Sequence, residues 1–75
     1  MIVTPKQAAD WLRHAPQRDL DGLKIRVFAA LMDRGEWTGN GTDWIVRDGQ
    51  LLDGNHRAYA LLLHGKPQDM PVIFQ

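Results

Sequence analysis

The residues that can do chemistry gather in one short stretch of the chain, residues 53–57, which reads Asp-Gly-Asn-His-Arg. A predicted strand runs into a glycine turn here, and a predicted helix begins at once. The first turn of a helix presents free N–H groups and a partial positive charge, which favour a bound anion. Because Gly54 has no Cβ, it allows the backbone to approach a ligand closely. The stretch therefore predicts a site for a phosphate group.

Three side chains of this stretch have chemical roles that fit a phosphate site. Arg57 carries a planar fork that binds two phosphate oxygens at once. His56 donates a hydrogen bond or moves a proton near neutral pH. Asp53 orients a metal or a hydroxyl, or acts as a base. Structural roles are open as well: Asp53 or Asn55 as a helix cap, Arg57 as the surface partner of Asp53, and His56 as a solvated residue.

Residues 49–60, Gly-Gln-Leu-Leu-Asp-Gly-Asn-His-Arg-Ala-Tyr-Ala, resemble the signature of the ParB/sulfiredoxin-like superfamily. The likeness is greatest to its short phage and mobile-element members, which read G-x-L-L-D-G-x-H-R-x-x-A. A Thr-Pro start, a helix ending at residues 34–37, a hairpin and a closing strand with Pro71-Val72 follow the order expected for that group. The resemblance implies one ParB/sulfiredoxin-like domain over residues 1–75.

The resemblance also implies a ligand. Related families hold the phosphates of a nucleotide in the equivalent loop, so here the phosphate-binding residues would be Gly54, Asn55, His56 and Arg57. The expected cofactor is a nucleoside triphosphate with magnesium, and another phosphorylated small molecule is the broader expectation; the base stays open. Asn55 stands where sulfiredoxins have their reactive cysteine. Since the chain contains no cysteine, reduction of a sulfinic acid is excluded.

Whether the site catalyses a reaction is left open by the sequence. Kinase or nuclease chemistry needs further acidic groups, and Asp53 and Glu36 are the candidates, Glu36 being the only glutamate in the chain. Nothing in their spacing shows that they converge. The three histidines have no chelating spacing, so we expect no metal site built from them.

A second hypothesis is a protein–protein interaction module, such as a phage- or mobile-element-encoded inhibitor of a host defence system (an anti-CRISPR), on the same scaffold. Trp37 and Trp44 flank a glycine-rich segment and could anchor a protein partner or stack on a base. The alternative for both is burial in the small core.

The charge and composition of the chain narrow the classes of partner that we expect it to bind. Nine basic and nine acidic residues give a formal net charge of zero, which argues against nucleic acid as the partner and leaves a DNA-associated factor as the weakest hypothesis. The chain contains no run of about 18 apolar residues, so we expect no membrane span. With no cysteine and no signal-peptide pattern at the start, we expect a cytoplasmic protein.

The hydrophobic pattern and the helix and turn signals predict an α+β domain in the order β-α-α-β-β-α-β with a mixed sheet. The expected strands are residues 1–3, 44–46, 50–52 and 71–74, and the third helix is residues 56–63. Thr4 caps the first helix in a capping box with Gln7, and Pro16 ends it.

The second helix is predicted to start after Asp19 or Asp21 and to stop at Gly35, and Asp48-Gly49 is predicted to form a type I′ turn. The apolar stripe expected to face the core from this helix is Leu20, Leu23, Val27, Phe28, Leu31 and Met32.

Overall fold

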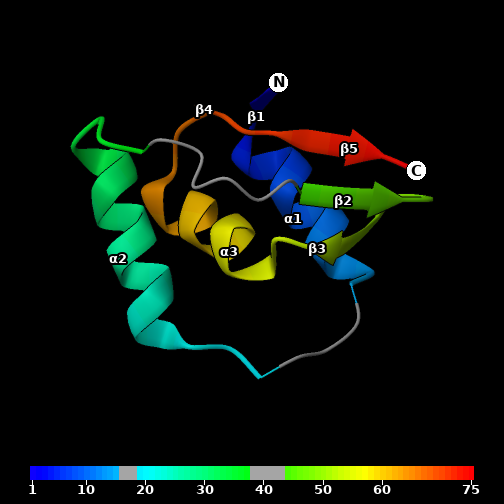
Figure 1. Cartoon of the computed structure of the whole chain (residues 1–75), viewed down its shortest axis with the longest axis horizontal. Helices are drawn as coiled ribbons and strands as arrows, with labels where there is room; N and C mark the ends of the chain where they lie inside the picture. The colour runs from blue at the N-terminus through cyan, green and yellow to red at the C-terminus, as the bar shows by residue number, and fades with distance from the viewer. Residues whose placement is uncertain (16–18, 38–43) are drawn as a thin grey trace.

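The computed structural model describes residues 1–15, 19–37 and 44–75, which form an α+β fold with three helices (Figure 1). Its elements are β1 (Ile2–Val3), α1 (Pro5–Arg13), α2 (Gly22–Asp33), β2 (Trp44–Arg47), β3 (Gln50–Asp53), α3 (Asn55–His64), β4 (Gln68–Asp69) and β5 (Val72–Phe74). The predicted order is confirmed except for β4, a two-residue strand that the pattern does not show.

The strands form two sheets. In the larger one, of order β3-β2-β5, β2 pairs antiparallel with β3 and parallel with β5. The turn between β2 and β3 has positive φ at both Asp48 (51°) and Gly49 (75°), as a type I′ turn requires. The predicted mixed sheet is therefore confirmed in these three strands, whereas β1 pairs with β4 in a separate antiparallel pair that was not predicted. Pro71, which lacks an N–H, separates β4 from β5.

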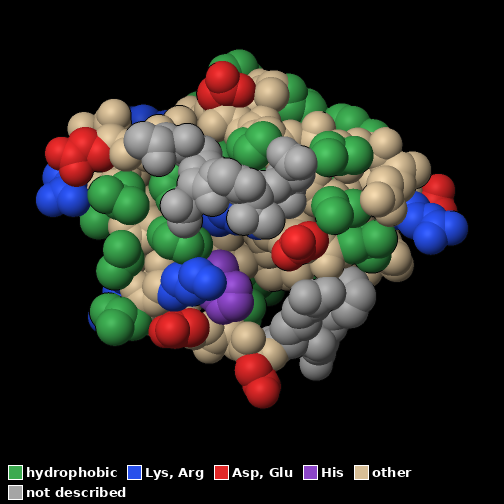
Figure 2. Space-filling model, in the orientation of Figure 1, with side chains coloured by type: hydrophobic (Ala, Val, Ile, Leu, Met, Phe, Trp, Pro, Cys, Tyr) green, Lys and Arg blue, Asp and Glu red, His purple; other side chains and the backbone are tan. Residues whose placement is uncertain are grey.

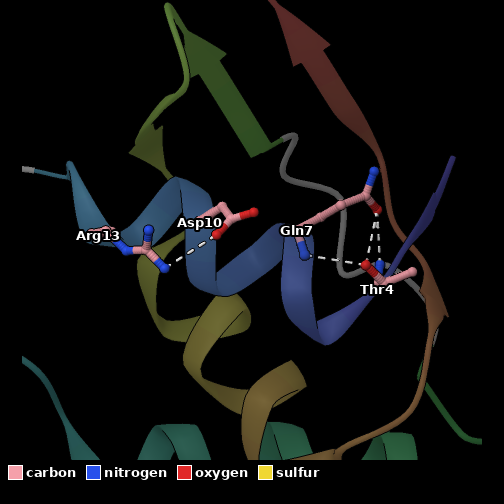
Figure 3. Close-up of polar contacts among 4 residues, drawn as sticks. All are labelled: Thr4, Gln7, Asp10 and Arg13. Carbon is pink, nitrogen blue, oxygen red and sulfur yellow. Dashed lines mark hydrogen bonds and ion pairs between the residues drawn. The ribbon is translucent and has the colours of Figure 1, made fainter.

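Helix α1 begins with the predicted capping box (Figure 3). The Thr4 hydroxyl accepts a hydrogen bond from the Gln7 N–H at 3.1 Å, and Gln7 Oε1 accepts one from the Thr4 N–H at 2.9 Å. Two backbone donors that the helix leaves free are satisfied in this way. The helix ends at Arg13, earlier than predicted; the proline expected to end it lies outside the described residues.

Both predicted ends of α2 are confirmed. Asp21 caps its start, where one carboxylate oxygen accepts hydrogen bonds from the N–H groups of Leu23 (3.0 Å) and Lys24 (3.3 Å). At its end the chain turns at Gly35, whose φ is +69°. The Glu36 N–H then donates to the Leu31 carbonyl at 2.8 Å, as in a Schellman motif.

The buried face of α2 differs from the predicted stripe. Leu20, Leu23 and Val27 are exposed, at 43 %, 64 % and 49 % of their maximal areas. The residues that face the core are Ala29 and Met32, both buried, with Ile25 and Phe28 packed against them. The prediction is confirmed for Phe28 and Met32 and wrong for the exposed residues, because α2 carries apolar residues on two faces and helical spacing alone does not say which face meets α3.

Helices α2 and α3 pack together and run in the same general direction (Figure 1). They are joined at both ends by histidines of α3. At the start, His56 Nε2 accepts a hydrogen bond from the Asp21 N–H at 3.0 Å. At the end, His64 Nδ1 lies 2.5 Å from an Asp33 carboxylate oxygen. The N-termini of the two helices, with their partial positive charges, therefore lie at the same end of the pair.

The burial of α2 makes a testable prediction about stability. Met32→Ala should lower the free energy of unfolding by about 2–5 kcal/mol, because it leaves a cavity in the core. Leu23→Ala removes a similar volume from an exposed position and should change it by no more than about 0.5 kcal/mol. Urea unfolding followed by circular dichroism measures both. Equal losses would show that the Leu23 face is buried in solution.

Candidate functional site

Helix α3 begins at Gly54 without a capping side chain. Gly54 has φ +98° and ψ +19°, and its carbonyl accepts the first helical hydrogen bond from the Ala58 N–H at 2.9 Å. The Asp53 carboxylate accepts a hydrogen bond from the Gly54 N–H at 2.8 Å, one residue before the helix. The N–H groups of Asn55 and His56, in the first turn, are capped by no side chain among the described residues. The start of α3 is thus rich in donors.

The backbone at Gly54 lies directly against two side chains. A Cβ at this position would stand 3.1 Å from Cγ and 3.2 Å from Cδ1 of Trp44, and 3.4 Å from an Arg57 guanidinium nitrogen. Real Cβ atoms are rarely this close to ring atoms. Both the positive φ and the close approach require glycine here, which explains why the strand turns into the helix at this residue.

The polar side chains around this turn are withdrawn from solvent. Asn55 and Arg57 each expose only 7 % of their maximal area. Arg57 is the third residue of α3, a position that often carries a glutamate, and its guanidinium folds back to Gly54 at the positive end of the helix. Positive charge is therefore concentrated where the helix itself is already positive. Such an arrangement favours binding of an anion.

Trp44 contributes an indole N–H to the same region. The side chain is fully buried, and Nε1 has no hydrogen-bond partner within the part of the chain that the structure describes. The ring atoms nearest to Gly54 are Cγ and Cδ1, and Nε1 is bonded to Cδ1. An unsatisfied buried donor costs about 1–3 kcal/mol, so it needs an explanation.

His56 lies in the first turn of α3 and makes a contact that the sequence did not predict. Its Nε2 accepts from the Asp21 N–H, so this nitrogen carries no hydrogen and the neutral ring is protonated at Nδ1. Only Nδ1 is left to donate to a ligand. The role of His56 as a phosphate ligand stays a prediction, and the structure gives it a second role, that of joining α3 to the start of α2.

The two candidate acids lie apart. Asp53 precedes the start of α3, whereas Glu36 follows the end of α2 and pairs with Arg34 in an exposed ion pair of 3.3 Å. Because both helices begin at the same end, Asp53 and Glu36 lie at opposite ends of the α2–α3 pair. Asp53 and Glu36 therefore do not form one acid–base pair in this structure.

The two tryptophans were predicted either to present binding surfaces or to cover the core, and the structure places them in or against the core. Trp44 is fully buried and contacts Trp11 edge-to-face, with 6.4 Å between ring centroids. Trp37 is half-buried and packs on Phe28 at 5.2 Å. A fully buried Trp44 offers no surface to a protein partner, which corrects that hypothesis for this residue.

Among the described residues, the structure shows neither a metal-binding cluster nor a helix that could cross a membrane. In residues 1–15, 19–37 and 44–75, no group of three or more His, Asp or Glu side chains is arranged to hold a metal ion. In the same part of the chain, no helix has both the length and the apolar character needed to cross a membrane.

Comparisons with protein-family models, with curated proteins and with solved structures each found no match. The resemblance to the ParB/sulfiredoxin-like superfamily therefore rests on the sequence of residues 49–60 and stays a hypothesis. The start of α3 is the place where that motif and the geometry coincide.

The close packing of Trp44 against Gly54 can be tested by comparing the stability of two glycine variants. Gly54→Ala should destabilise the protein more than Gly65→Ala, although both residues have positive φ and flank α3. A Cβ at Gly65 meets open space, so that change costs only the left-handed conformation, about 1–2 kcal/mol. At Gly54 the Cβ also displaces Trp44. Thermal and urea unfolding would measure both variants, and equal losses would mean that Trp44 does not press on Gly54.

Proposed function

We propose that this protein binds the phosphate group of a nucleotide or of another phosphorylated small molecule at the start of α3. The observation that carries the proposal is the arrangement around Gly54. An uncapped helix N-terminus, a buried arginine folded over it and a buried indole ring meet at Gly54, whose missing Cβ lets the Trp44 ring and the Arg57 guanidinium pack against the backbone. The motif in residues 49–60 supports the same ligand independently of this geometry.

The charges near Gly54 suit one phosphate group better than a nucleic acid backbone. Arg57 supplies one cation, and the helix supplies a partial charge of about +0.5. On the face shown in Figure 2, Lys and Arg are interspersed with Asp and Glu rather than gathered in a basic patch. Proteins that hold a nucleic acid backbone neutralise several phosphates with a basic surface.

A nucleoside triphosphate fits the donors at this helix start through its phosphates. Backbone N–H groups and a guanidinium are the partners that phosphate oxygens take up in proteins. The expected magnesium would come bound to the triphosphate, as magnesium often does. Catalysis is not part of the proposal, because Asp53 and Glu36 lie at opposite ends of the α2–α3 pair.

The proposal predicts which variants lose affinity for phosphate. Arg57→Gln should weaken binding of inorganic phosphate and of nucleoside triphosphates by about 10–100-fold, since a hydrogen bond to a charged group contributes about 1.5–3 kcal/mol. Arg47→Gln makes the same change at an exposed position of β2 and should keep the wild-type affinity. Calorimetric titration with phosphate, ATP, CTP and GTP measures the affinities, and circular dichroism checks that both variants fold.

The wild-type protein provides the decisive control. In a two-dimensional NMR titration with phosphate at constant ionic strength, the backbone signals of Asn55 and His56 should shift and saturate. The absence of any shift at millimolar phosphate and millimolar nucleotide would contradict the proposal, whatever the variants do.

A second candidate function, protein–protein interaction, is favoured by the outer face of α2. Leu23 and Val27 are exposed on this helix, and Leu20 is exposed just before it. Figure 2 shows hydrophobic side chains along the side of the molecule where α2 lies in Figure 1. Contiguous apolar surface on a small protein often marks an interface.

The two functions are separated by one pair of variants. If α2 binds a protein partner, Leu23→Glu should abolish its recovery in a pulldown and Arg57→Gln should leave it intact. The uncharged variant Leu23→Gln, which adds no negative charge near the start of α3, should leave phosphate affinity unchanged, because Leu23 exposes 64 % of its area and is absent from the core. A partner that binds the Leu23→Glu variant as well as the wild type would exclude this face as the interface.

A further inference from the structure

The buried indole of Trp44 is the feature for which the fold itself gives no reason. Trp44 is fully buried, and its Nε1 finds no acceptor among the described residues. A phenylalanine would also bury an aromatic ring here, although a smaller one, and would bring no donor to satisfy. The N–H therefore either is a net cost to the folded protein or has an acceptor that binds from outside.

The position of the ring indicates where such an acceptor would sit. Cγ and Cδ1 of Trp44 lie 3.1 and 3.2 Å from the point where a Cβ of Gly54 would be, and Nε1 is bonded to Cδ1. An Arg57 guanidinium nitrogen lies 3.4 Å from the same point. The indole donor and the guanidinium thus approach the uncapped start of α3 from two elements, β2 and α3.

We propose that the Trp44 Nε1–H donates a hydrogen bond to the anion bound at the start of α3. This inference rests on the proposed phosphate site and adds a residue to it that lies outside the motif of residues 49–60. In this arrangement the phosphate oxygens accept from the backbone N–H groups of the first turn, from Arg57 and from Trp44. The anion then supplies the acceptor that the buried indole lacks.

Trp37 provides a control within the same molecule. Its Nε1 is also buried and has no partner in the described part of the chain, but its ring packs on Phe28 of α2. No contact of Trp37 with Gly54 is found among the described residues. Trp37 is therefore an orphan donor that the proposal does not connect with the anion.

The first test follows the indole N–H signals of the wild-type protein during a titration with inorganic phosphate. The three signals are assigned from spectra of Trp11→Phe, Trp37→Phe and Trp44→Phe. The Trp44 signal should move downfield and exchange more slowly with solvent, in proportion to the shifts of the Asn55 and His56 backbone signals. The Trp11 and Trp37 signals should stay in place.

The second test measures affinity. Trp44→Phe keeps an aromatic ring and removes the donor, so it should weaken phosphate binding by about 10–100-fold. Trp37→Phe should bind phosphate as the wild type does. If Trp44→Phe fails to fold, the indole signal of the wild type still decides.

The outcomes distinguish this inference from the function on which it rests. Backbone signals that shift while the Trp44 indole stays in place would overturn the role of Trp44 and leave the phosphate site standing. If neither the backbone nor the indole signals shift at millimolar phosphate, both are overturned.

Discussion

The register between β2 and β3 decides what lies opposite Trp44, and the site depends on it. From the turn, Arg47 pairs with Gln50 and Val46 with Leu51, but Ile45 pairs with Asp53 because Leu52 is the extra residue of a bulge. Without the bulge, the same count would bring Trp44 opposite Asp53. With it, Trp44 meets Gly54, the one residue type that accepts an indole ring at this distance.

This contact joins the core to the start of α3. Trp44 is among the largest fully buried side chains, and it packs in the same cluster as Leu51 and Leu61. A ring held so firmly fixes the position of Gly54, and Gly54 fixes where α3 begins. The donors of the first turn are therefore preorganised by hydrophobic packing, so that an anion would bind without a large ordering cost.

The two parallel helices use their positive ends differently. At α2, the Asp21 carboxylate accepts two backbone N–H groups, and His56 accepts the N–H of Asp21 itself. At α3, the Asp53 carboxylate accepts from the Gly54 N–H, before the helix begins. The Asp21 side chain thus caps the start of α2, whereas the start of α3 has glycine, which has no side chain, at the capping position. Parallel alignment places both positive ends together, which makes the uncapped one still more favourable for an anion.

Local signals predicted most of the elements of this fold. Thr4 and Gln7, Asp21, Gly35 and Asp48-Gly49 each act within a few residues, and each forms the cap or turn that its type favours. What local signals did not predict depends on contacts between distant segments. The pairing of β1 with β4 joins the two ends of the chain.

The predicted buried face of α2 was partly wrong for the same reason, because Leu23 and Val27, which are exposed, satisfy the helical period as well as Met32, which is buried. Which side meets α3 depends on tertiary packing.

The candidate site shows the same division between local and distant information. Gly54 and Arg57 were recognisable from their types and their place between a strand and a helix. The second role of His56 could be predicted only with the position of α2 known, because its hydrogen-bond partner, Asp21, is 35 residues away. The contact of Trp44 with Gly54 could not be predicted without the bulge, because a regular hairpin places Asp53, and not Gly54, opposite the ring. A motif thus identifies the segment that carries charge, but the donors that complete an anion site come from whichever strands the register brings beside it.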